Sequence, residues 1–361
     1  MSGQATRRPR LFVMLPAHLD TTDYHEQFLE GRRADRSPWG FGWAADHGYD
    51  VTFSRPTKMR GLAGFVQRVV RTLVGADLLH GWANRREIRE SELVLTHMER
   101  EWVAAAFVIR GRRPTTPRLI ANTIWLPGEW QTRSIGWRWA VNRARPKVEQ
   151  FTFNALPAQA AFTAIFGDST ATRYVPFGIS WESYLPATTG PASNSVLVAG
   201  DDRYRDWALL ERVAGALPTV RFVVASRSTP ASLGTLPNVD VVTASGPRDM
   251  QRLYEQSAVG FIPLKPNLHA SGITVALETA RIGRPIVISD TGGIGDYFSS
   301  SEVVFFAPGD AADAEAALSD LLDDPGRAQS LAESATERIA ASANDSRSFI
   351  ARLLSLDGRP T

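Results

Sequence analysis

Residues 271–298 read SGITVALETARIGRPIVISDTGGIGDYF. The stretch opens with small residues and continues as an amphipathic segment that ends at Gly283, which is typical of a helix and its C-terminal cap. The apolar run PIVISD follows and predicts a buried strand, and a glycine-rich turn closes it at 291–296. A helix, a buried strand and a turn in this order predict an α/β fold.

The same alternation extends through the rest of the chain. We expect strands at 11–15, 50–54, 93–96, 118–122, 150–154, 195–199, 220–225, 239–243, 259–264, 285–289 and 303–306. We expect helices near 59–76, 99–110, 132–144, 157–166, 205–216, 248–256, 273–282, 311–323 and 325–342. Strands joined by such helices are linked by crossovers, so both sheets should be mainly parallel. The sequence therefore predicts two doubly wound, Rossmann-like domains.

Length and charge place the domain boundary near Pro186. The chain has 361 residues, which suits two domains. Residues 1–186 carry 25 Lys and Arg against 17 Asp and Glu, whereas residues 187–361 carry 15 against 21. The segment PATTGPASN at 186–194 has the composition of a linker. We expect an N-terminal domain at 1–186, a second domain at 187–345, and a C-terminal helix or tail at 346–361 that packs back on the first domain.

Composition excludes several classes of site. The chain has no cysteine, which excludes disulfides, thiolate nucleophiles and cysteine-ligated metals, and its 6 histidines lack metal-type spacing. No apolar run reaches the roughly 18 residues of a transmembrane helix. A strand-like segment follows the basic N-terminus where a signal peptide would have its apolar region, so we expect a cytosolic protein.

The start of the quoted stretch has the features of a diphosphate site. Small residues before a helix let backbone N–H groups approach a ligand, and the helix N-terminus carries the positive end of the dipole. Glu278 lies one helical turn after Thr274, so its carboxylate could accept hydrogen bonds from a ribose diol at the same place. The alternative is that Ser271 and Gly272 form an ordinary helix cap and that Glu278 is a solvated residue.

A second group of polar residues follows the strand SVLVAG. Arg203 and Arg205 lie in the loop after its carboxyl end, where a guanidinium can bind phosphate oxygens in a bidentate way. The alternative is a surface salt-bridge network with Asp201, Asp202 and Asp206.

Three segments together resemble the GT-B glycosyltransferases, most closely the family-4-like group (glycosyl transferases group 1). TRYVPFGISWESYLP at 172–186 is similar to the family's interdomain passage, SVLVAGDDRYRDW at 195–207 to its first donor-domain loop, and residues 271–298 to its donor-binding segment. The resemblance implies two domains that face each other across a cleft, with the acceptor on the first and a nucleotide-sugar donor on the second. The residues it assigns to the donor are Ser271, Gly272, Ile273 and Thr274 for the diphosphate, Glu278 for the ribose, and Arg205 with its neighbour Arg203 for the diphosphate charge.

The chain also departs from the family pattern. Retaining members carry a glutamate eight positions before the one matched by Glu278, and Ala270 stands there with His269 beside it. Phe177 replaces the asparagine of the interdomain passage, and the usual Gly-rich loop after the first strand is replaced by residues 15–20. The sugar, the acceptor and the stereochemistry of transfer therefore do not follow from the resemblance.

Candidate acid–base groups lie after the strands of the first domain. His97 follows the strand ELVLT, at a position where the family often has a histidine facing the donor sugar, and it is our candidate catalytic residue together with Arg205. His18 and Asp20 follow the first strand and are acceptor-side candidates if the reaction inverts. Structural roles are the alternatives: a satisfied buried histidine at His97, and loop capping by His18 and Asp20.

Two basic segments interleave arginines with apolar and aromatic residues. For residues 58–76 we favour a helix that faces the core with a solvated basic rim. For residues 130–147 two interpretations stay open: contact with an anionic membrane surface or an acceptor phosphate, and a core-facing helix with a solvated basic rim. Nucleic acid is not an expected partner, because no known binding motif occurs and the second domain is acidic.

The resulting prediction is a cytoplasmic glycosyltransferase of the hexosyltransferase type, for which peripheral membrane contact stays an open alternative. It would move a sugar from a nucleotide-diphosphate sugar to a hydroxyl of a glycan, a lipid-linked molecule or a small molecule, with retention and without a metal or cofactor. The alternatives are a nucleotide-sugar 2-epimerase or hydrolase of the same fold, and a two-domain ligand-binding protein without catalysis.

Overall fold

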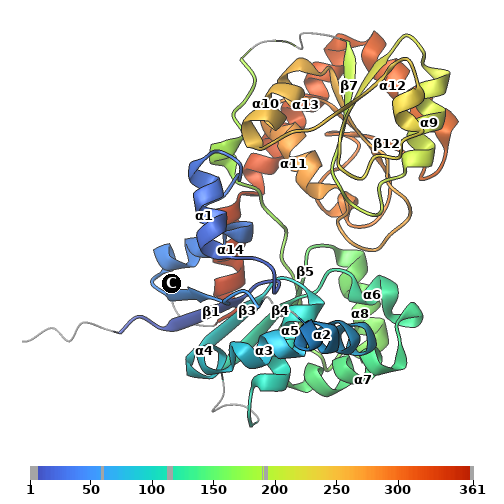
Figure 1. Cartoon of the computed structure of the whole chain (residues 1–361). Helices are drawn as coiled ribbons and strands as arrows, with labels where there is room; N and C mark the ends of the chain where they lie inside the picture. Colours follow the sequence, from blue (N-terminus) through green and yellow to red (C-terminus); the bar gives the residue numbers. More distant parts are fainter. Residues whose placement is uncertain (1–6, 58–60, 112–116, 189, 191–193, 358–361) are drawn as a thin grey trace, which may run out of the picture. The chain divides into compact units, whose positions relative to one another are not determined.

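The structure is a computed structural model that describes residues 7–57, 61–111, 117–188, 190 and 194–357. The chain divides into two compact units (Figure 1). The first unit comprises the chain up to Glu26, Arg36–Val175 and the chain from Ile350 onward. The second comprises Gln27–Asp35 and Pro176–Phe349.

The first unit is built on a parallel sheet of the order β2-β1-β3-β4-β5-β6. Its strands are β1 (Arg10–Met14), β2 (Asp50–Phe53), β3 (Leu93–Thr96), β4 (Arg118–Asn122), β5 (Gln150–Phe153) and β6 (Thr172–Tyr174). The helices around it are α1 (Thr21–Leu29), which runs on into the second unit, α2 (Gly61–Val74), α3 (Leu78–Ala83), α4 (Arg85–Glu90), α5 (Glu99–Val108), α6 (Leu126–Glu129), α7 (Ile135–Ala144) and α8 (Leu156–Phe166). The 3-10 helices η1 (Pro38–His47), η2 (Trp130–Thr132) and η3 (Arg145–Lys147) complete it.

The second unit contains a parallel sheet of the order β12-β11-β10-β7-β8-β9. Its strands are β7 (Ser195–Ala199), β8 (Arg221–Ala225), β9 (Val239–Val242), β10 (Val259–Ile262), β11 (Ile286–Ser289) and β12 (Val304–Phe306). Its helices are α9 (Trp207–Ala216), α10 (Pro247–Gln256), α11 (Ile273–Ile282), α12 (Ala311–Asp323), α13 (Pro325–Ala341) and α14 (Ser346–Ser355), with η4 (Trp181–Ser183), η5 (Leu233–Thr235) and η6 (Ile294–Asp296) between them. The expectation of two doubly wound α/β domains is confirmed.

Strands buried on both faces explain the continuous apolar runs of the sequence. In β7, Val196 and Val198 pack with α9 and α12 on one face, while Leu197 and Ala199 pack with α10, α11 and α13 on the other. Figure 1 shows these two helical layers on either side of the sheet of the second unit. This double burial is characteristic of parallel sheets.

The division into units differs from the expected boundary at Pro186. Residues 176–186 pack on the second unit, where the backbone N–H of Phe177 donates to the Tyr297 hydroxyl at 2.8 Å. The crossing point follows directly on β6, since the first sheet ends at Tyr174. Of the expected linker, residues 189 and 191–193 lie outside the described residues.

The C-terminal segment, expected at 346–361, is divided between the two units. Its helix α14 begins in the second unit, and the chain from Ile350 onward belongs to the first. There, Arg118 donates to the buried carboxylate of Asp357, and Tyr49 donates to the same carboxylate at 2.7 Å. Residues 358–361 lie outside the described part.

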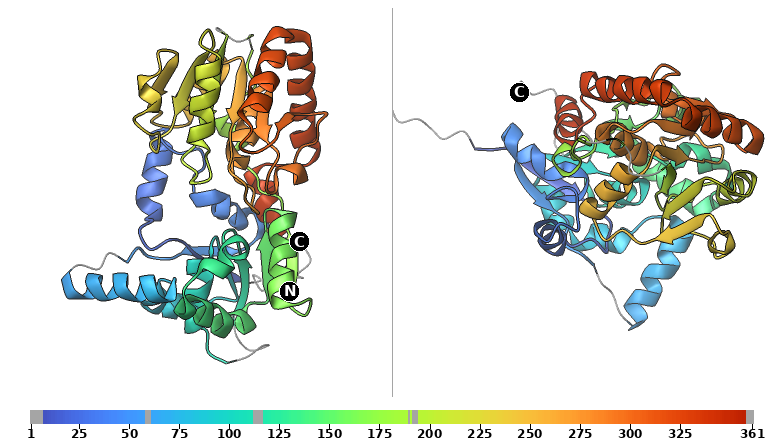
Figure 2. Two further views of the ribbon diagram at one scale, coloured as in Figure 1. Left: turned by 90° about the vertical axis from the view of Figure 1, so that its right-hand side faces the viewer. Right: turned by 90° about the horizontal axis from the view of Figure 1, so that it is seen from above.

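The core-facing interpretation of residues 58–76 is wrong for three side chains of α2. Phe65, Val69 and Leu73 are 56%, 39% and 59% exposed. Figure 2 shows α2 projecting from the body of the first unit. Lys58, Met59 and Arg60 of this segment lie outside the described part.

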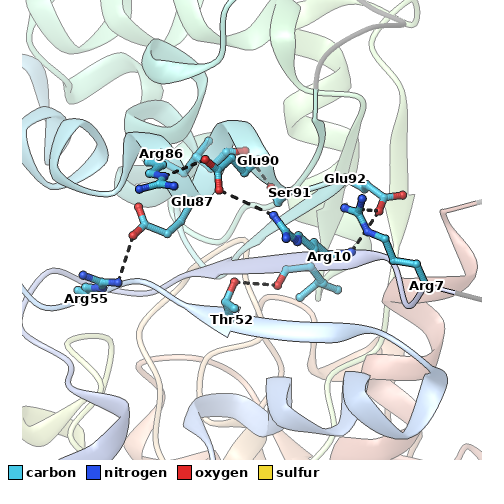
Figure 3. A network of polar contacts seen from close by, with 11 residues as sticks. Arg7, Arg10, Thr52, Arg55, Arg86, Glu87, Glu90, Ser91 and Glu92 are labelled. Atoms are coloured by element: carbon cyan, nitrogen blue, oxygen red, sulfur yellow. Dashed lines mark hydrogen bonds and ion pairs between the residues drawn. The ribbon is translucent and has the colours of Figure 1, made fainter.

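Part of the basic excess of the first unit is neutralised by carboxylates of α4 (Figure 3). Arg86 donates to Glu90 at 2.8 Å, and the guanidinium of Arg10 lies 3.8 Å from the same carboxylate. Arg55 lies 3.5 Å from Glu87. These arginines are therefore balanced by carboxylates of α4.

The described part of the chain contains no helix that is both long and apolar enough to cross a bilayer.

Candidate functional site

The strand order of the second unit predicts where a ligand binds. Numbered from its own first strand, the order is 3-2-1-4-5-6, and the connections reverse direction between β7 and β10, which pair directly. Open α/β sheets bind ligands outside the carboxyl ends of the strands at this switch point. The loops after β7 and β10 contain the two polar groups that the sequence singles out.

The loop after β7 is folded around Arg205. Backbone hydrogen bonds join it to the end of β10, from Asp206 N to Pro263 O at 3.0 Å and from Lys265 N to Tyr204 O at 2.8 Å. The side chain of Arg205 turns back over Gly200, where a Cβ would lie 2.4 Å from Nη2. Gly200 has a φ of 105°, a backbone conformation that favours glycine, and the absence of a side chain leaves room for the guanidinium.

Arg205 is a buried cation with unused donors. Its side chain is only 1% exposed, and its Nε and Nη1 have no hydrogen-bond partner within the described part of the chain. Burial lowers the pKa of Arg205 to about 10, although the charge of Asp202 opposes this, so the guanidinium stays charged at neutral pH. Because buried polar groups are nearly always satisfied, unused N–H donors on a buried cation indicate an anionic ligand.

The carboxylates of this loop are bound elsewhere rather than to Arg205. Asp201 accepts from Arg227 Nε at 2.7 Å, and Asp202 accepts from the backbone N–H of Tyr204 at 2.7 Å. Asp202 also accepts from the hydroxyl of Ser271, which joins this loop to the start of α11. The alternative of a salt-bridge network is therefore not seen for Arg205, and Asp201 pairs with Arg227 instead. Arg203 is exposed and lies over the Tyr204 ring.

The start of α11 is a compact turn at the same edge of the sheet. Gly272 is the N-cap residue with a φ of 73°, and a Cβ there would lie 2.8 Å from Ile262 Cγ2 at the end of β10. Ser271 and Ile273 are buried, whereas Thr274 is exposed. The loop after β11 closes the turn, because Gly293 N donates to His269 O at 3.1 Å. Glycine thus brings the helix N-terminus close to the strand ends.

Glu278 lies on α11 and is buried rather than solvated. It is 9% exposed, and its Oε2 accepts from the hydroxyl of Tyr254 on α10 at 2.7 Å. Burial raises the pKa of Glu278 to about 7, while hydrogen bonds from Tyr254 and Tyr184 lower it in part. The carboxyl group is thus held in one orientation and changes charge near neutral pH.

The first unit has a switch point of its own, between β1 and β3, which also pair directly. His97 follows β3 there, is 6% exposed, and stacks on Trp39 with ring centroids 3.8 Å apart. Burial lowers the pKa of His97 to about 3, so the imidazole is neutral at physiological pH. Its Nδ1 has no hydrogen-bond partner among the described residues.

The backbone of Trp39 and two buried polar side chains hold this edge of the first unit. Trp39 has a φ of 52°, an unusual value for a bulky residue, and this conformation accompanies its stacking on His97. Asn122 at the end of β4 donates from Nδ2 to His97 O at 3.1 Å. Glu99 accepts from the backbone N–H groups of residues 124, 125 and 126 at 2.7, 2.6 and 2.9 Å. His97 therefore lies on a rigid scaffold.

The two acceptor-side candidates differ. His18 is exposed after β1. Asp20 accepts from the backbone N–H of Thr22 at 2.9 Å, so it caps the start of α1. The capping alternative therefore describes Asp20 in this structure.

Sequence reasoning missed several residues of these sites. Gly200 could have been found as a glycine directly after a buried strand, where the backbone often approaches a ligand. Tyr254 and Trp39 left no such signal, because their partners Glu278 and His97 are remote in sequence. Only the packing of α10 on α11, and the stacking of Trp39 of η1 on His97, reveal them.

Two Rossmann-like units with these sheet orders define the class of protein as one of GT-B fold. Sucrose-phosphate synthase from Thermosynechococcus elongatus superposes with a TM-score of 0.73, with 14% identity over 97% of this chain and 98% of that chain. HepE of Anabaena, solved with UDP and glucose, gives a TM-score of 0.69 with 12% identity over 97% of this chain and 99% of the other. At these identities the likeness is one of fold.

Sequence similarity identifies the domain of the second unit more specifically. Residues 204–324 match the family Glycosyl transferases group 1, so the expected kinship with GT-B glycosyltransferases is confirmed. Glycogen synthase of Mycobacterium tuberculosis is 42% identical over 66 residues, which are 18% of this chain and 16% of that protein. The chain thus matches only a small part of this curated relative's length.

Proposed function

We propose that the protein is a glycosyltransferase that moves a hexosyl group from a nucleotide-diphosphate sugar to an acceptor hydroxyl. The observation that carries the proposal is Arg205, a buried cation with two unpartnered nitrogens at the switch point of the second unit. The match of residues 204–324 to the glycosyl transferases group 1 supports it independently.

The second unit would bind the donor. Arg205, with Arg203 as its neighbour, would neutralise the diphosphate, and the backbone from Ser271 to Thr274 would donate hydrogen bonds from the positive end of the α11 dipole. Glu278 would accept hydrogen bonds from the ribose hydroxyls in its ionised form. HepE of Anabaena was solved with UDP-glucose, which supports a nucleotide-sugar donor for this fold.

The first unit would bind the acceptor, which we expect to be a glycan, a lipid-linked molecule or a small molecule. His97 is neutral because its pKa is lowered to about 3, so it would act as a hydrogen-bonding partner of a sugar hydroxyl rather than as a cation. His18 is exposed after β1 and would lie on the acceptor side.

In the transfer, the bond between the anomeric carbon and the diphosphate oxygen breaks, and a bond from that carbon to the acceptor oxygen forms. The acceptor proton passes to the leaving diphosphate, so the protein needs to supply charge stabilisation rather than a strong base. We propose retention of configuration on this basis. Arg205 and the α11 N-terminus would take the role of a cation, so that the reaction proceeds without a metal.

A thermal-shift panel of UDP-, GDP-, ADP- and TDP-sugars tests the donor assignment. A ligand at about 100 times its dissociation constant stabilises the fold by about 2.7 kcal/mol. At least one donor should raise the melting temperature, with the same shift in the presence of EDTA. No shift with any donor would contradict the proposal.

Incubating the stabilising donor alone separates transfer from the alternatives. A transferase should release little free nucleotide until an acceptor pool is added. Rapid conversion of the donor alone would indicate an epimerase or a hydrolase. Donor binding without turnover in any acceptor pool would indicate a binding protein.

A further inference from the structure

The exposed face of α2 carries a line of large apolar side chains. Phe65, Val69 and Leu73 are four residues apart, so they lie along one face of the helix. They are 56%, 39% and 59% exposed, which is unusual for apolar residues of this size in one row. In Figure 2 this helix extends away from the rest of the first unit.

α7 packs against the end of α2 and carries exposed apolar side chains of its own. Ser134 Oγ donates to Leu73 O at 3.0 Å, and a Cβ at Gly136 would lie 2.6 Å from the same oxygen. This close packing places Ile135 beside the end of α2. Ile135 and Trp139 are 81% and 56% exposed on one face of α7. We call the row formed by Phe65, Val69, Leu73, Ile135 and Trp139 the α2–α7 surface.

The charge around the α2–α7 surface is mainly positive. Residues 51–76 and 130–148 each contain 5 Lys or Arg and no Asp or Glu, although Arg55 pairs with Glu87 and Arg133 with Glu129. Arg68 and Arg71 are exposed on α2, and no carboxylate within the described residues pairs with either. The arginines near β1 differ, because Arg10, Arg55 and Arg86 each lie beside a glutamate (Figure 3).

We propose that the α2–α7 surface binds to an anionic lipid bilayer. The apolar row would enter the boundary between headgroups and acyl chains, and Arg68 and Arg71 would lie against lipid phosphates. Apolar and aromatic side chains flanked by unpaired arginines suit this interface, where each cation near the surface adds about 1 kcal/mol, or about fivefold in affinity. This surface is separate from the donor residues of the second unit, so the inference does not depend on the proposed reaction.

Sedimentation of the full chain with vesicles tests the inference. We expect binding to vesicles of phosphatidylcholine mixed with phosphatidylglycerol, and little binding to phosphatidylcholine alone. The double variant Phe65→Ser/Leu73→Ser should weaken binding about tenfold or more, because it removes the apolar anchor. Arg68→Glu/Arg71→Glu should weaken it to a similar degree and mainly at low salt.

Matched controls come from exposed residues elsewhere. Val241→Ser removes an exposed apolar side chain of the second unit, and Arg86→Glu reverses a paired arginine, and both should bind vesicles like the unaltered chain. The substituted side chains on α2 are exposed, so the circular dichroism and melting temperature should be retained. On binding, the fluorescence of Trp139 should shift to the blue, and a Trp139→Phe variant should lack this shift.

Three results would overturn the inference. The first is that the unaltered chain does not bind the anionic vesicles, and the second is that the α2 variants bind as well as the controls. The third is a dimer in light scattering that Phe65→Ser/Leu73→Ser converts to a monomer, with no vesicle binding in either case, which would assign the surface to a second copy of the chain.

Discussion

The hydroxyl of Tyr254 on α10 donates a 2.7 Å hydrogen bond to Oε2 of Glu278 on α11. Both side chains are buried, and the rings of Tyr184 and Tyr254 meet edge to face with centroids 6.4 Å apart. Burial raises the pKa of Glu278 to about 7, whereas the hydrogen bonds from the tyrosines favour the carboxylate. Tyr254 is therefore a positioning residue that orients Glu278 and affects its charge.

Donor binding should depend on pH through Glu278. If the carboxylate accepts the ribose hydroxyls, affinity rises with pH through the pKa of about 7. Tyr254→Phe removes a bond that stabilises the charged form, so the midpoint should move to higher pH. Glu278→Gln should bind more weakly and lose this dependence. Calorimetry from about pH 5.5 to about pH 8.5 measures this, and an affinity of the unaltered chain that falls with pH would contradict the ribose assignment.

Arg205 should lower the free energy of unfolding of the protein when no ligand is bound. Its Nε and Nη1 are buried without a partner among the described residues. Arg205→Met keeps the length of the side chain and removes the buried charge, so the free energy of unfolding without ligand should rise by about 1–3 kcal/mol. Denaturant unfolding measures this change. A loss of stability instead would mean that Arg205 supports the fold and is not reserved for an anion.

Trp39 should keep His97 neutral. The stacked indole excludes water from the imidazole, and burial lowers the pKa of His97 to about 3 from an ordinary 6.5. Trp39→Ala admits water and should raise this pKa toward its ordinary value. An NMR titration of the ring protons, assigned with His97→Gln, measures the shift. Trp82→Ala, at an exposed tryptophan, is the control, and equal pKa values in both variants would disprove the role of Trp39.

Glu101 should make folding less favourable as pH rises. Burial raises its pKa to about 8 in the folded chain from an ordinary 4.5, so the folded state holds a proton that the unfolded state loses. The contribution of Glu101 to the free energy of unfolding is fully present below about pH 4.5 and is lost as pH rises to about pH 8. Glu101→Gln should therefore match the unaltered chain at low pH and exceed it by about 2–4 kcal/mol near pH 8. Denaturant unfolding at both pH values checks this, and an equal difference at both would contradict it.

The sequence predicted the elements whose pattern is local. The helices expected at 273–282 and 311–323 agree with α11 and α12 in the structure, because each has a clear apolar stripe and a terminal cap. The short helices α3 and α4 and the three-residue β6 were not predicted, since such lengths carry little periodicity. The exposure of Phe65 could not be predicted either, because an apolar row on a helix looks the same whether it faces a core or a membrane.

The loops of the candidate site could be predicted from the sequence, but the contacts of their side chains could not. The small residues before α11 and the arginines after β7 place both groups at the carboxyl edge of the second sheet, as the structure has them. That Arg205 is buried and Arg203 exposed depends on the backbone pairing between residues 204–206 and 263–265, which no local pattern encodes.

Calorimetric titration of the donor that gives the largest thermal shift tests the central claim most directly. The unaltered chain and Arg212→Ala, a substitution of an exposed arginine on α9, should bind it equally. Arg205→Ala should bind it about 10- to 100-fold more weakly, since a charge-assisted hydrogen bond contributes about 1.5–3 kcal/mol. Equal affinities in all three proteins would contradict the assignment of Arg205 to the donor diphosphate.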